Sequence, residues 1–164
     1  LKVCHLRYFN PAGADSKNNW GEAHEPETHL IPNLVRAALK KETFSIFGNN
    51  HPTPDGTCIR DFIHVLDLAE AHVIALQQLL QGHALPQSIN IGSGKGTSVG
   101  EVVKTASQVL KQQIKVEIKE PRPGDPPELV SETSLMRTHL KWEPQRSLAQ
   151  MILDDWSWRQ SRVK

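Results

Sequence analysis

The sequence predicts an α/β fold of mixed α+β character. Apolar residues alternate with polar ones in several short runs, as expected for strands, and recur every three or four residues in longer runs, as expected for helices. Glycine and proline clusters separate these runs. Because strands and helices alternate along the chain, a helical bundle and an all-β sandwich are both disfavoured.

The first part of the chain begins with an apolar, β-branched stretch that is typical of a buried strand. Pro32 lies in the first turn of the helix that follows, where proline is tolerated. In chain order we expect a strand at residues 2–9 that ends at Asn10-Pro11, a polar loop at 14–27, a helix at about 31–41, a strand around Phe44 and Ile46, and a proline-stiffened loop up to Gly56.

In the second part, helix starts are indicated by polar caps that precede an acidic residue or glutamine by three positions. The expected elements are a helix at about 68–80 with Asp67 and Glu70 as its capping box, a strand around Ile89 and Ile91, a helix capped by Ser98 and Glu101, a strand at 114–118, a rigid loop at 121–127, and two short helices, the last starting at Ser147.

Size and charge exclude several classes of protein. The 164 residues suffice for one domain or most of one, and 19 Lys and Arg against 18 Asp and Glu leave a net charge of +1. No block of like charge suggests a nucleic-acid surface, and no run of about 18 apolar residues suggests a membrane span. The first strand is expected to be buried and to need neighbours on both sides, which are predicted to lie outside this chain.

The two cysteines, Cys4 and Cys58, are too few for a disulfide scaffold and predict reduced thiols in a cytoplasmic setting. Cys58 lies near His51, Asp61 and His64 in the sequence, but the spacing fits no zinc pattern, so no metal site is predicted. His64, His72 and His83 are interpreted as ordinary strand or helix residues rather than catalysts.

The glycine cluster at residues 92–96 follows a strand and invites a phosphate-binding interpretation. A Walker loop requires glycine where Ile89 stands, and a dinucleotide fingerprint requires glycine where Thr97 stands. We therefore interpret the cluster as a tight turn between a strand and a helix.

Two loop arginines, Arg60 and Arg122, are candidates for phosphate recognition, since guanidinium binds phosphate in a bidentate manner. The alternative is a surface ion pair, Arg60 with Asp61 or Arg122 with Asp125.

Several motifs, in order, together resemble the UDP-glucose 4-epimerase family of the extended short-chain dehydrogenase/reductase superfamily. They are the segments 6–14, 46–49, 52–57, 60–65, 90–94, 122–125 and 140–144. The resemblance covers essentially the whole chain, although that family usually has glycine where Lys141 stands. It implies that residues 1–164 are the C-terminal, substrate-binding portion with the last elements of a Rossmann sheet, and that an N-terminal NAD-binding Rossmann portion is absent from the chain.

The resemblance also implies roles for individual residues. Tyr8 and Phe9 correspond to the contact with the nicotinamide end of NAD, and Asn10, Arg60 and Arg122 to the grip on the substrate diphosphate. His29 and Leu30 match backbone groups at a helix start that approach the diphosphate. The remaining matches are Ser45, Ile46 and Phe47 for the uracil, Asp125 in the loop Arg122-Pro123-Gly124-Asp125 for the ribose hydroxyls, and Leu129 as a gatekeeper beside the sugar.

Catalysis in this family uses NAD and a Tyr-x-x-x-Lys pair. Tyr8 is the single tyrosine here and Ala12 stands four residues later, so no catalytic residue is predicted in this chain. The expected function is UDP-galactose/UDP-glucose interconversion, with this chain as the UDP-sugar-binding half, inactive alone, and its N-terminal half and a second full-length subunit as partners. Two alternatives stay open: an epimerase, decarboxylase or dehydratase acting on UDP-glucuronate, and a non-catalytic nucleotide-sugar-binding module.

Overall fold

The structure is a computed structural model that describes residues 2–15, 17 and 19–162. Its strands are β1 (His5–Tyr8), β2 (Asn10–Ala12), β3 (Phe44–Phe47), β4 (Ile59–His64), β5 (Ser88–Ile91), β6 (Gly96–Ser98), β7 (Val116–Lys119) and β8 (Glu128–Leu129). Its helices are α1 (Leu30–Lys40), α2 (Val65–Leu80), α3 (Val99–Val109), the π-helical η1 (Met136–Leu140) and α4 (Leu148–Gln160).

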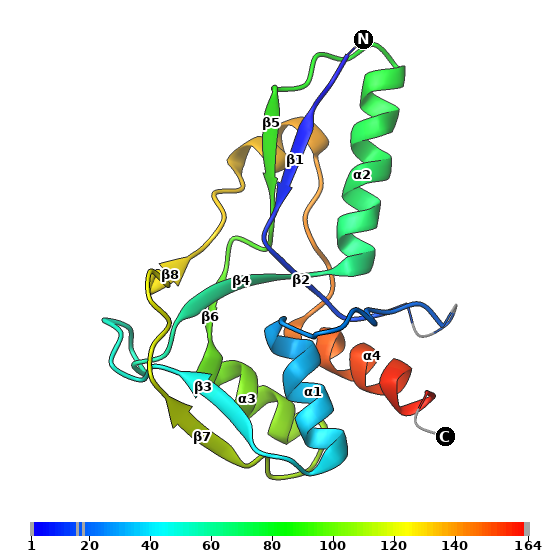
Figure 1. The fold of residues 1–164 in the computed structure, drawn as a ribbon. Coiled ribbons are helices and arrows are strands. Elements are labelled where there is room, and N and C mark those ends of the chain that lie inside the picture. Colours follow the sequence, from blue (N-terminus) through cyan, green and yellow to red (C-terminus); the bar gives the residue numbers. More distant parts are fainter. Residues whose placement is uncertain (1, 16, 18, 163–164) are drawn as a thin grey trace.

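Parallel strand pairing dominates the topology. The pairs β1–β5, β2–β4, β3–β7 and β4–β8 are parallel, and β4–β6 is antiparallel. Figure 1 shows β1, β5 and α2 in the upper part of the molecule, with α1, α3, α4, β3 and β7 in the lower part and β4 crossing between them. The predicted α/β class is confirmed.

Two apolar clusters form the core, one in each part. The upper cluster joins β5, α2 and η1, and the lower one joins α1, α3, α4 and β3. The buried members of the upper cluster are Ile63, Ala71, Ala75, Ile89, Ile91, Met136 and Leu140. Strand β4 contributes Ile63 to the upper cluster and Phe62 to the lower one. Because adjacent side chains of a strand point to opposite faces, this one strand links both clusters.

The strand predicted at residues 2–9 is present as β1, which ends at Tyr8, but it is largely exposed rather than buried, and the turn predicted at Asn10-Pro11 is wrong because these residues form β2. After Tyr8 the chain changes partner from β5 to β4, with Asn10 opposite Phe62 and Pro11 opposite Ile63. Proline has no N–H to donate, and it is tolerated here because β4 is the one strand partner of β2 within the described part of the chain.

The predicted capping box at Asp67 and Glu70 is also wrong. Helix α2 begins at Val65, and the side chain of His64 caps it by accepting a hydrogen bond from Leu66 N at 3.1 Å. The buried Asp67 carboxylate instead accepts from the backbone N–H of Arg146 at 2.9 Å and pairs with the Arg146 guanidinium. The carboxylate predicted to cap the helix is therefore bound by the loop at Arg146, which is distant in sequence. By contrast, the predicted capping box of Ser98 with Glu101 is confirmed at the start of α3.

His64 is fully buried and has both ring nitrogens occupied. Its Nδ1 accepts from Leu66 N, so Nε2 carries the proton and donates to Asp154 Oδ2 at 3.1 Å. Gly13 lies against the ring: a Cβ there would be 2.7 Å from His64 Nε2, and its φ of +89° favours glycine. Burial lowers the pKa of His64, opposed by Asp154 and Asp67 and assisted by the charge of Arg146.

We expect the free energy of unfolding to fall as the pH drops below about 6.5, the usual pKa of histidine. With a lowered pKa in the fold, the unfolded chain binds the proton first and is favoured by acid. Urea unfolding between pH 7.5 and pH 5 should show a weaker pH dependence in His64→Asn, where asparagine still caps the helix. The exposed His83→Asn is the control, and an unchanged slope in His64→Asn would contradict the assignment.

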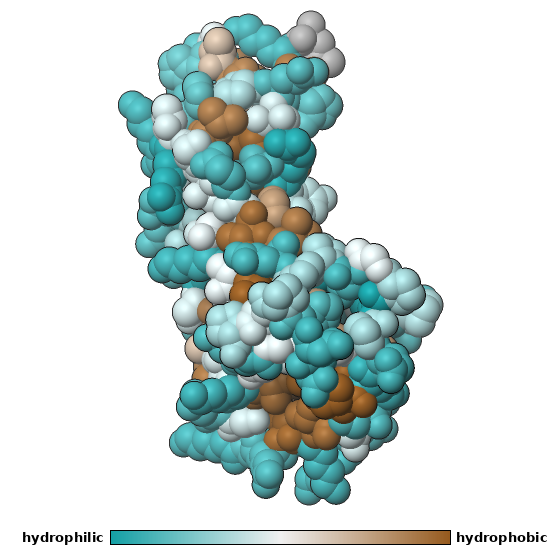
Figure 2. Space-filling model, turned by 90° about the vertical axis from the view of Figure 1, so that its left-hand side faces the viewer, coloured by the Kyte–Doolittle hydropathy of each residue, from teal (hydrophilic) through white to brown (hydrophobic). Residues whose placement is uncertain are grey.

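Large apolar side chains are exposed on several elements. On α2, Val73, Leu76 and Leu80 recur at helical spacing and are 54%, 57% and 78% exposed. On the face shown in Figure 2, hydrophilic residues divide the apolar surface into separate patches. None of the helices in the described part of the chain has the length and apolar character needed to cross a membrane.

Candidate functional site

A cavity of about 820 Å³ lies at the centre of the candidate site. It collects residues from β2, β3, β4, the whole length of α1 with the loop before it, the start of α3 and the loop that follows β7. Nine of the residues singled out from the sequence line it: Asn10, His29, Leu30, Ser45, Ile46, Phe47, Arg60, Arg122 and Asp125. Segments up to 115 residues apart in the chain therefore converge on one cavity.

Strand β3 offers an open backbone edge to this cavity. Phe44 N donates to Lys115 O and Gly48 N donates to Lys119 O, so the even-numbered residues of this segment bond to β7. Because the backbone groups of successive strand residues alternate in direction, those of Ser45 and Phe47 point to the opposite edge. No strand covers that edge within the described residues. A planar hydrogen-bonding group could pair with it as another strand would.

Phe47 and Arg122 form one wall of the cavity. The Arg122 guanidinium lies 4.1 Å from the centroid of the Phe47 ring, a cation–π contact. Next to it, the hydroxyl of Ser45 donates to Glu117 at 2.7 Å. The expected pair of Arg122 with Asp125 is absent: the two residues share a backbone hydrogen bond from Asp125 N to Arg122 O at 3.2 Å.

Arg60 is held at the cavity by three partners. Its guanidinium pairs with Asp125 and donates to the carbonyl oxygens of Ile59 at 2.7 Å and Pro126 at 2.9 Å. The alternative that Arg60 forms an ion pair is therefore right in kind, but the partner is Asp125 rather than Asp61. The carboxylate expected to bind ribose hydroxyls is engaged by Arg60 in this structure.

Asp61 points to the other face of β4 and organises the loops behind the cavity. Its carboxylate accepts from Ser93 N at 2.9 Å, from Gly94 N at 3.1 Å and from Ser131 N at 3.1 Å, and also from the hydroxyls of Ser93 and Ser131. A Cβ at Gly92 would lie 2.6 Å from Asp61 Oδ2. The glycine cluster is thus a turn, as predicted, but it joins β5 to the short strand β6 rather than leading directly into a helix, and it is bound to a buried carboxylate.

This role of Asp61 was missed because its side chain was considered only as a partner for Arg60 and as a metal ligand near Cys58. The signal was present in the sequence: adjacent strand residues point to opposite faces, so Arg60 and Asp61 cannot both face the same loop.

Asn10 and the start of α1 close the cavity. The Asn10 side-chain amide donates to the backbone oxygen of Asp61 at 2.8 Å, which orients it. The N–H of His29 is not free, contrary to expectation: it donates to Glu27 Oε1 at 3.0 Å, as does the N–H of Thr28. Leu30 is the first helical residue, where backbone N–H groups lack partners within the helix.

The other predicted site residues lie outside the cavity lining. Tyr8 ends β1 and is 53% exposed, and Phe9 connects β1 with β2. Pro123 and Gly124 form the turn between Arg122 and Asp125, with a φ of +78° at Gly124. Leu129 in β8 stands opposite Arg60 in the strand register and is 48% exposed.

Cys58 and His51, considered above with a metal in mind, approach each other: Cys58 Sγ lies 3.3 Å from His51 Nε2. Asp61 and His64 have the separate partners described above, so the four residues form no cluster. Both cysteines are free, as predicted, and burial raises the pKa of each thiol.

Comparisons with known proteins identify relatives along the whole chain. A UDP-glucose 4-epimerase from Rhizobium meliloti is 46% identical over 163 residues, which are 99% of this chain and 49% of that protein. One from Halalkalibacterium halodurans is 46% identical over 95% of the chain and 47% of its own length. The chain spans about half the length of the curated relatives that it matches.

Solved structures show the same fold. The UDP-glucose 4-epimerase of Stenotrophomonas maltophila, with bound NAD and formylated UDP-arabinopyranose, superposes with a TM-score of 0.92 at 34% identity and covers 99% of this chain and 48% of its own. The UDP-glucose 4-epimerase of Bifidobacterium longum in complex with NAD+ and UDP superposes with a TM-score of 0.88 at 30% identity, and the match covers 98% of this chain and 48% of that one. The model of the NAD dependent epimerase/dehydratase family matches residues 1–92. The chain belongs to the NAD-dependent epimerase/dehydratase family.

Proposed function

We propose that this chain is the UDP-sugar-binding half of a UDP-glucose 4-epimerase that interconverts UDP-galactose and UDP-glucose. The observation that carries the proposal is the cavity itself, which joins an open strand edge to the guanidinium groups of Arg60 and Arg122. The 46% identity with UDP-glucose 4-epimerases supports the choice of substrate.

The open edge of β3 is assigned to the uracil. Backbone groups of Ser45 and Phe47 pair with the edge of the base, and the Phe47 ring packs against it. This contact reads the base through main-chain hydrogen bonds, so substitutions at Ser45 that preserve the strand leave recognition intact.

The diphosphate is assigned to Asn10, Arg60 and Arg122, with the start of α1 at Leu30 adding its unpaired N–H groups. Guanidinium binds phosphate in a planar, bidentate manner, and Arg60 is held in place by its carbonyl partners. Asp125 then serves two partners, Arg60 and the ribose hydroxyls. Leu129, opposite Arg60, is the proposed gatekeeper beside the sugar.

The nicotinamide end of NAD is assigned to Tyr8 and Phe9. Both lie at the carboxyl end of β1, and in parallel sheets ligands bind beyond that end of the strands. NAD supplies reversible hydride acceptance at C4 of the sugar. This chain orients the nucleotide, while the Tyr-x-x-x-Lys pair and most of the NAD site belong to the N-terminal half.

The surface for that half is assigned to β1 and α2. A parallel sheet of two strands is rarely stable with an open face, and Val73, Leu76 and Leu80 present an exposed apolar stripe beside it.

The full-length protein should convert UDP-galactose to UDP-glucose, measured by oxidation of the product with a coupled UDP-glucose dehydrogenase. The isolated chain should show no turnover because it lacks the proton-transferring pair. If the full-length protein prefers UDP-glucuronate, the protein is instead an epimerase, decarboxylase or dehydratase acting on UDP-glucuronate. Turnover by the pure isolated chain would refute the claim that the proton-transferring pair lies in the N-terminal half. Tight, saturable binding of UDP-glucose by the isolated chain in calorimetry would favour a stand-alone binding module.

A further inference from the structure

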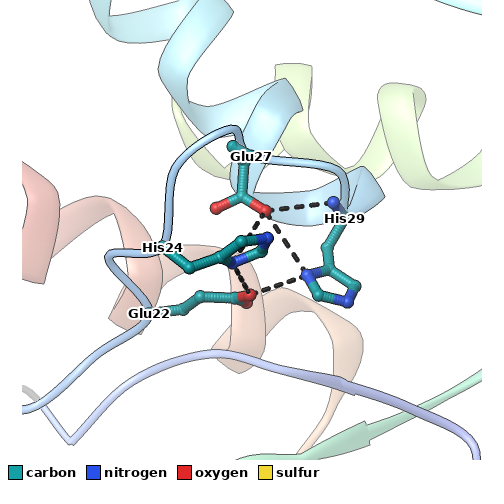
Figure 3. Close-up of side chains that lie close together, drawn as sticks. All are labelled: Glu22, His24, Glu27 and His29. Carbon is teal, nitrogen blue, oxygen red and sulfur yellow. Dashed lines mark hydrogen bonds and ion pairs between the residues drawn. The ribbon is translucent and has the colours of Figure 1, made fainter.

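The loop between β2 and α1 gathers two histidines and two glutamates into one cluster, formed by Glu22, His24, Glu27 and His29 (Figure 3). One nitrogen or oxygen atom of each residue lies within 4.8 Å of those of the other three. All four residues come from a stretch of eight along the chain. The cluster is separate from the diphosphate grip of Asn10, Arg60 and Arg122, although Glu27 and His29 also line the cavity.

The distances within the cluster match those between ligands of a tetrahedral zinc ion. Zinc binds histidine nitrogen and carboxylate oxygen at about 2.0–2.1 Å, which separates neighbouring ligand atoms by about 3.3 Å. The Nδ1 atom of His24 lies 2.8 Å from Glu22 Oε1 and 3.8 Å from Glu27 Oε1. The Nδ1 atom of His29 lies 2.6 and 3.4 Å from the same two oxygens. Both imidazoles therefore direct the same nitrogen at both carboxylates.

We propose that these four side chains bind a divalent transition-metal ion of the zinc class in a closed, four-ligand site. Imidazole and carboxylate are ligands that zinc shares with other late first-row ions, and magnesium prefers an all-oxygen, hydrated shell. A site with four protein ligands leaves no position for substrate, so its role is structural. This proposal does not depend on the assigned UDP-sugar chemistry.

The loop is anchored before any ion binds. On α4, Trp158 Nε1 donates to Asn19 O at 3.2 Å, and Arg159 donates to Glu22 O at 3.1 Å. The Trp158 ring also covers Gly21, where a Cβ would meet it at 2.4 Å. Ligands held in position by the fold lose less conformational entropy on binding an ion than ligands on a free loop.

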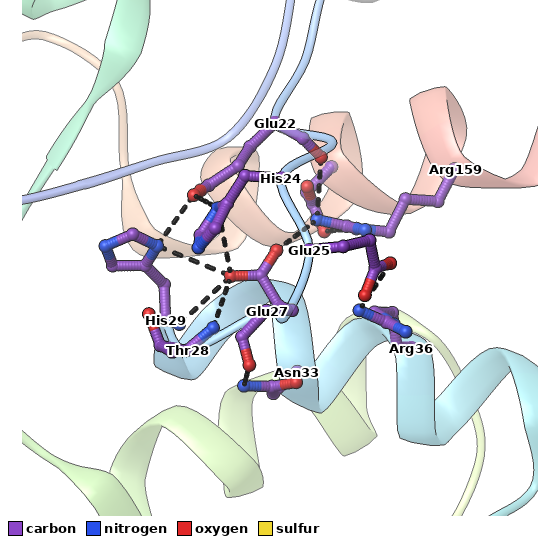
Figure 4. Close-up of polar contacts among 10 residues, drawn as sticks. Glu22, His24, Glu25, Glu27, Thr28, His29, Asn33, Arg36 and Arg159 are labelled. Carbon is purple, nitrogen blue, oxygen red and sulfur yellow. Dashed lines mark hydrogen bonds and ion pairs between the residues drawn. The ribbon is translucent and has the colours of Figure 1, made fainter.

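Glu27 has the surroundings of an oriented ligand. Its side chain is 1% exposed, its Oε1 accepts from the N–H groups of Thr28 and His29, and its Oε2 lies 3.4 Å from Arg159 (Figure 4). Burial raises the pKa of Glu27, but the N–H of His29 and the charges of Arg159 and His24 outweigh it and lower the pKa. Such outer hydrogen bonds are what fix ligating carboxylates in metal sites.

The charge around the cluster also favours a cation. Buried Asp155 on α4 pairs with Arg159 through Oδ2, while its Oδ1 has no hydrogen-bond partner within the described residues. Burial raises the pKa of Asp155 to about 6 against the opposing effect of Arg159, and the charges of Glu27 and Glu22 add to the shift. The carboxylates of Glu27 and Asp155 thus share the charge of Arg159, and a divalent ion at the cluster would relieve their repulsion.

The competing interpretation is a set of ion pairs between protonated imidazoles and the two glutamates. The two interpretations predict different responses of the chain to added zinc. An ion-pair network has no need of zinc, whereas a metal site binds one ion per chain.

The test is titration of the chelator-treated chain with ZnCl2 in calorimetry, and with CoCl2 followed by visible absorption. We expect one equivalent of zinc to bind, intense d–d bands of tetrahedral cobalt that zinc abolishes, and no binding of Mg²⁺. His24→Ala and Glu22→Gln should each weaken zinc binding by about 100-fold, consistent with the loss of one ligand interaction. His83→Ala, which removes an exposed histidine remote in sequence, is the matched control.

His24→Ala and Glu22→Gln each alter an exposed or half-exposed side chain, so circular dichroism should report an intact fold for both proteins. Absence of saturable zinc binding, the weak spectrum of octahedral cobalt, or unchanged affinity in both His24→Ala and Glu22→Gln would each overturn the proposal.

Discussion

Asp61→Ala is expected to lower the free energy of unfolding by about 3–5 kcal/mol, the range for breaking a buried charged network. The Asp61 side chain is fully buried and accepts hydrogen bonds from three backbone N–H groups and two hydroxyls. Alanine removes the acceptor of all five donors. The two donors of Ser131 are buried, and each unsatisfied buried donor costs about 1–3 kcal/mol before relaxation.

Asp61→Asn separates hydrogen bonding from volume. Asparagine has the same size but one acceptor oxygen, and its NH2 group would face donors, so it should be nearly as destabilising as alanine. Glu132→Gln is the control, because Glu132 is an exposed carboxylate that accepts from Ser134 in the neighbouring loop, and it should change the stability by less than about 0.5 kcal/mol. Urea unfolding gives the free energy of unfolding of the Asp61→Ala, Asp61→Asn and Glu132→Gln proteins. An Asp61→Asn protein as stable as the parent would contradict the acceptor role.

The local part of the fold could be predicted from the sequence because its causes are local. The capping box at Ser98 and the cap at Ser147 are side chains that reach three residues along their own chain, and both are present. The start of α2 could not be found in this way. Asp67 had two possible partners, its own helix and the loop at Arg146, and only the folded chain shows that the loop wins.

The same distinction applies to the site. Nine predicted residues line one cavity, and six of them lie in motifs that were matched in order. The pairings within it were not predictable: Arg60 binds Asp125, 65 residues away, and the N–H of His29 is taken by Glu27. The His and Glu cluster was missed because the loop at 14–27 was regarded only as polar. The spacing Glu22-x-His24-x-x-Glu27-x-His29 was the available signal.

Arg60→Ala in the full-length protein is expected to lower kcat/KM for UDP-galactose by about 100-fold, because loss of a charge-assisted contact to phosphate costs about 3 kcal/mol. Arg60 is 13% exposed in its side chain and is held by two carbonyl oxygens, so its charge is fixed at the cavity wall. Arg122 stacks on Phe47 from an exposed loop, and Arg122→Ala should cost only about tenfold because a more solvated charge contributes less.

Binding of UDP and of uridine distinguishes a phosphate contact from general damage. If Arg60 binds the diphosphate, Arg60→Ala weakens UDP binding strongly and leaves uridine binding within about twofold, while Phe47→Ala weakens both because the base contact is lost. Arg137→Ala, which removes an exposed arginine paired with Glu143, controls for the change in net charge. Asp125→Asn removes the ion pair but keeps Arg60 and leaves an amide oxygen that can accept from a ribose hydroxyl, so UDP binding should fall less than in Arg60→Ala. Equal losses of UDP and uridine binding in Arg60→Ala would show that Arg60 supports the cavity through Asp125 and does not contact phosphate.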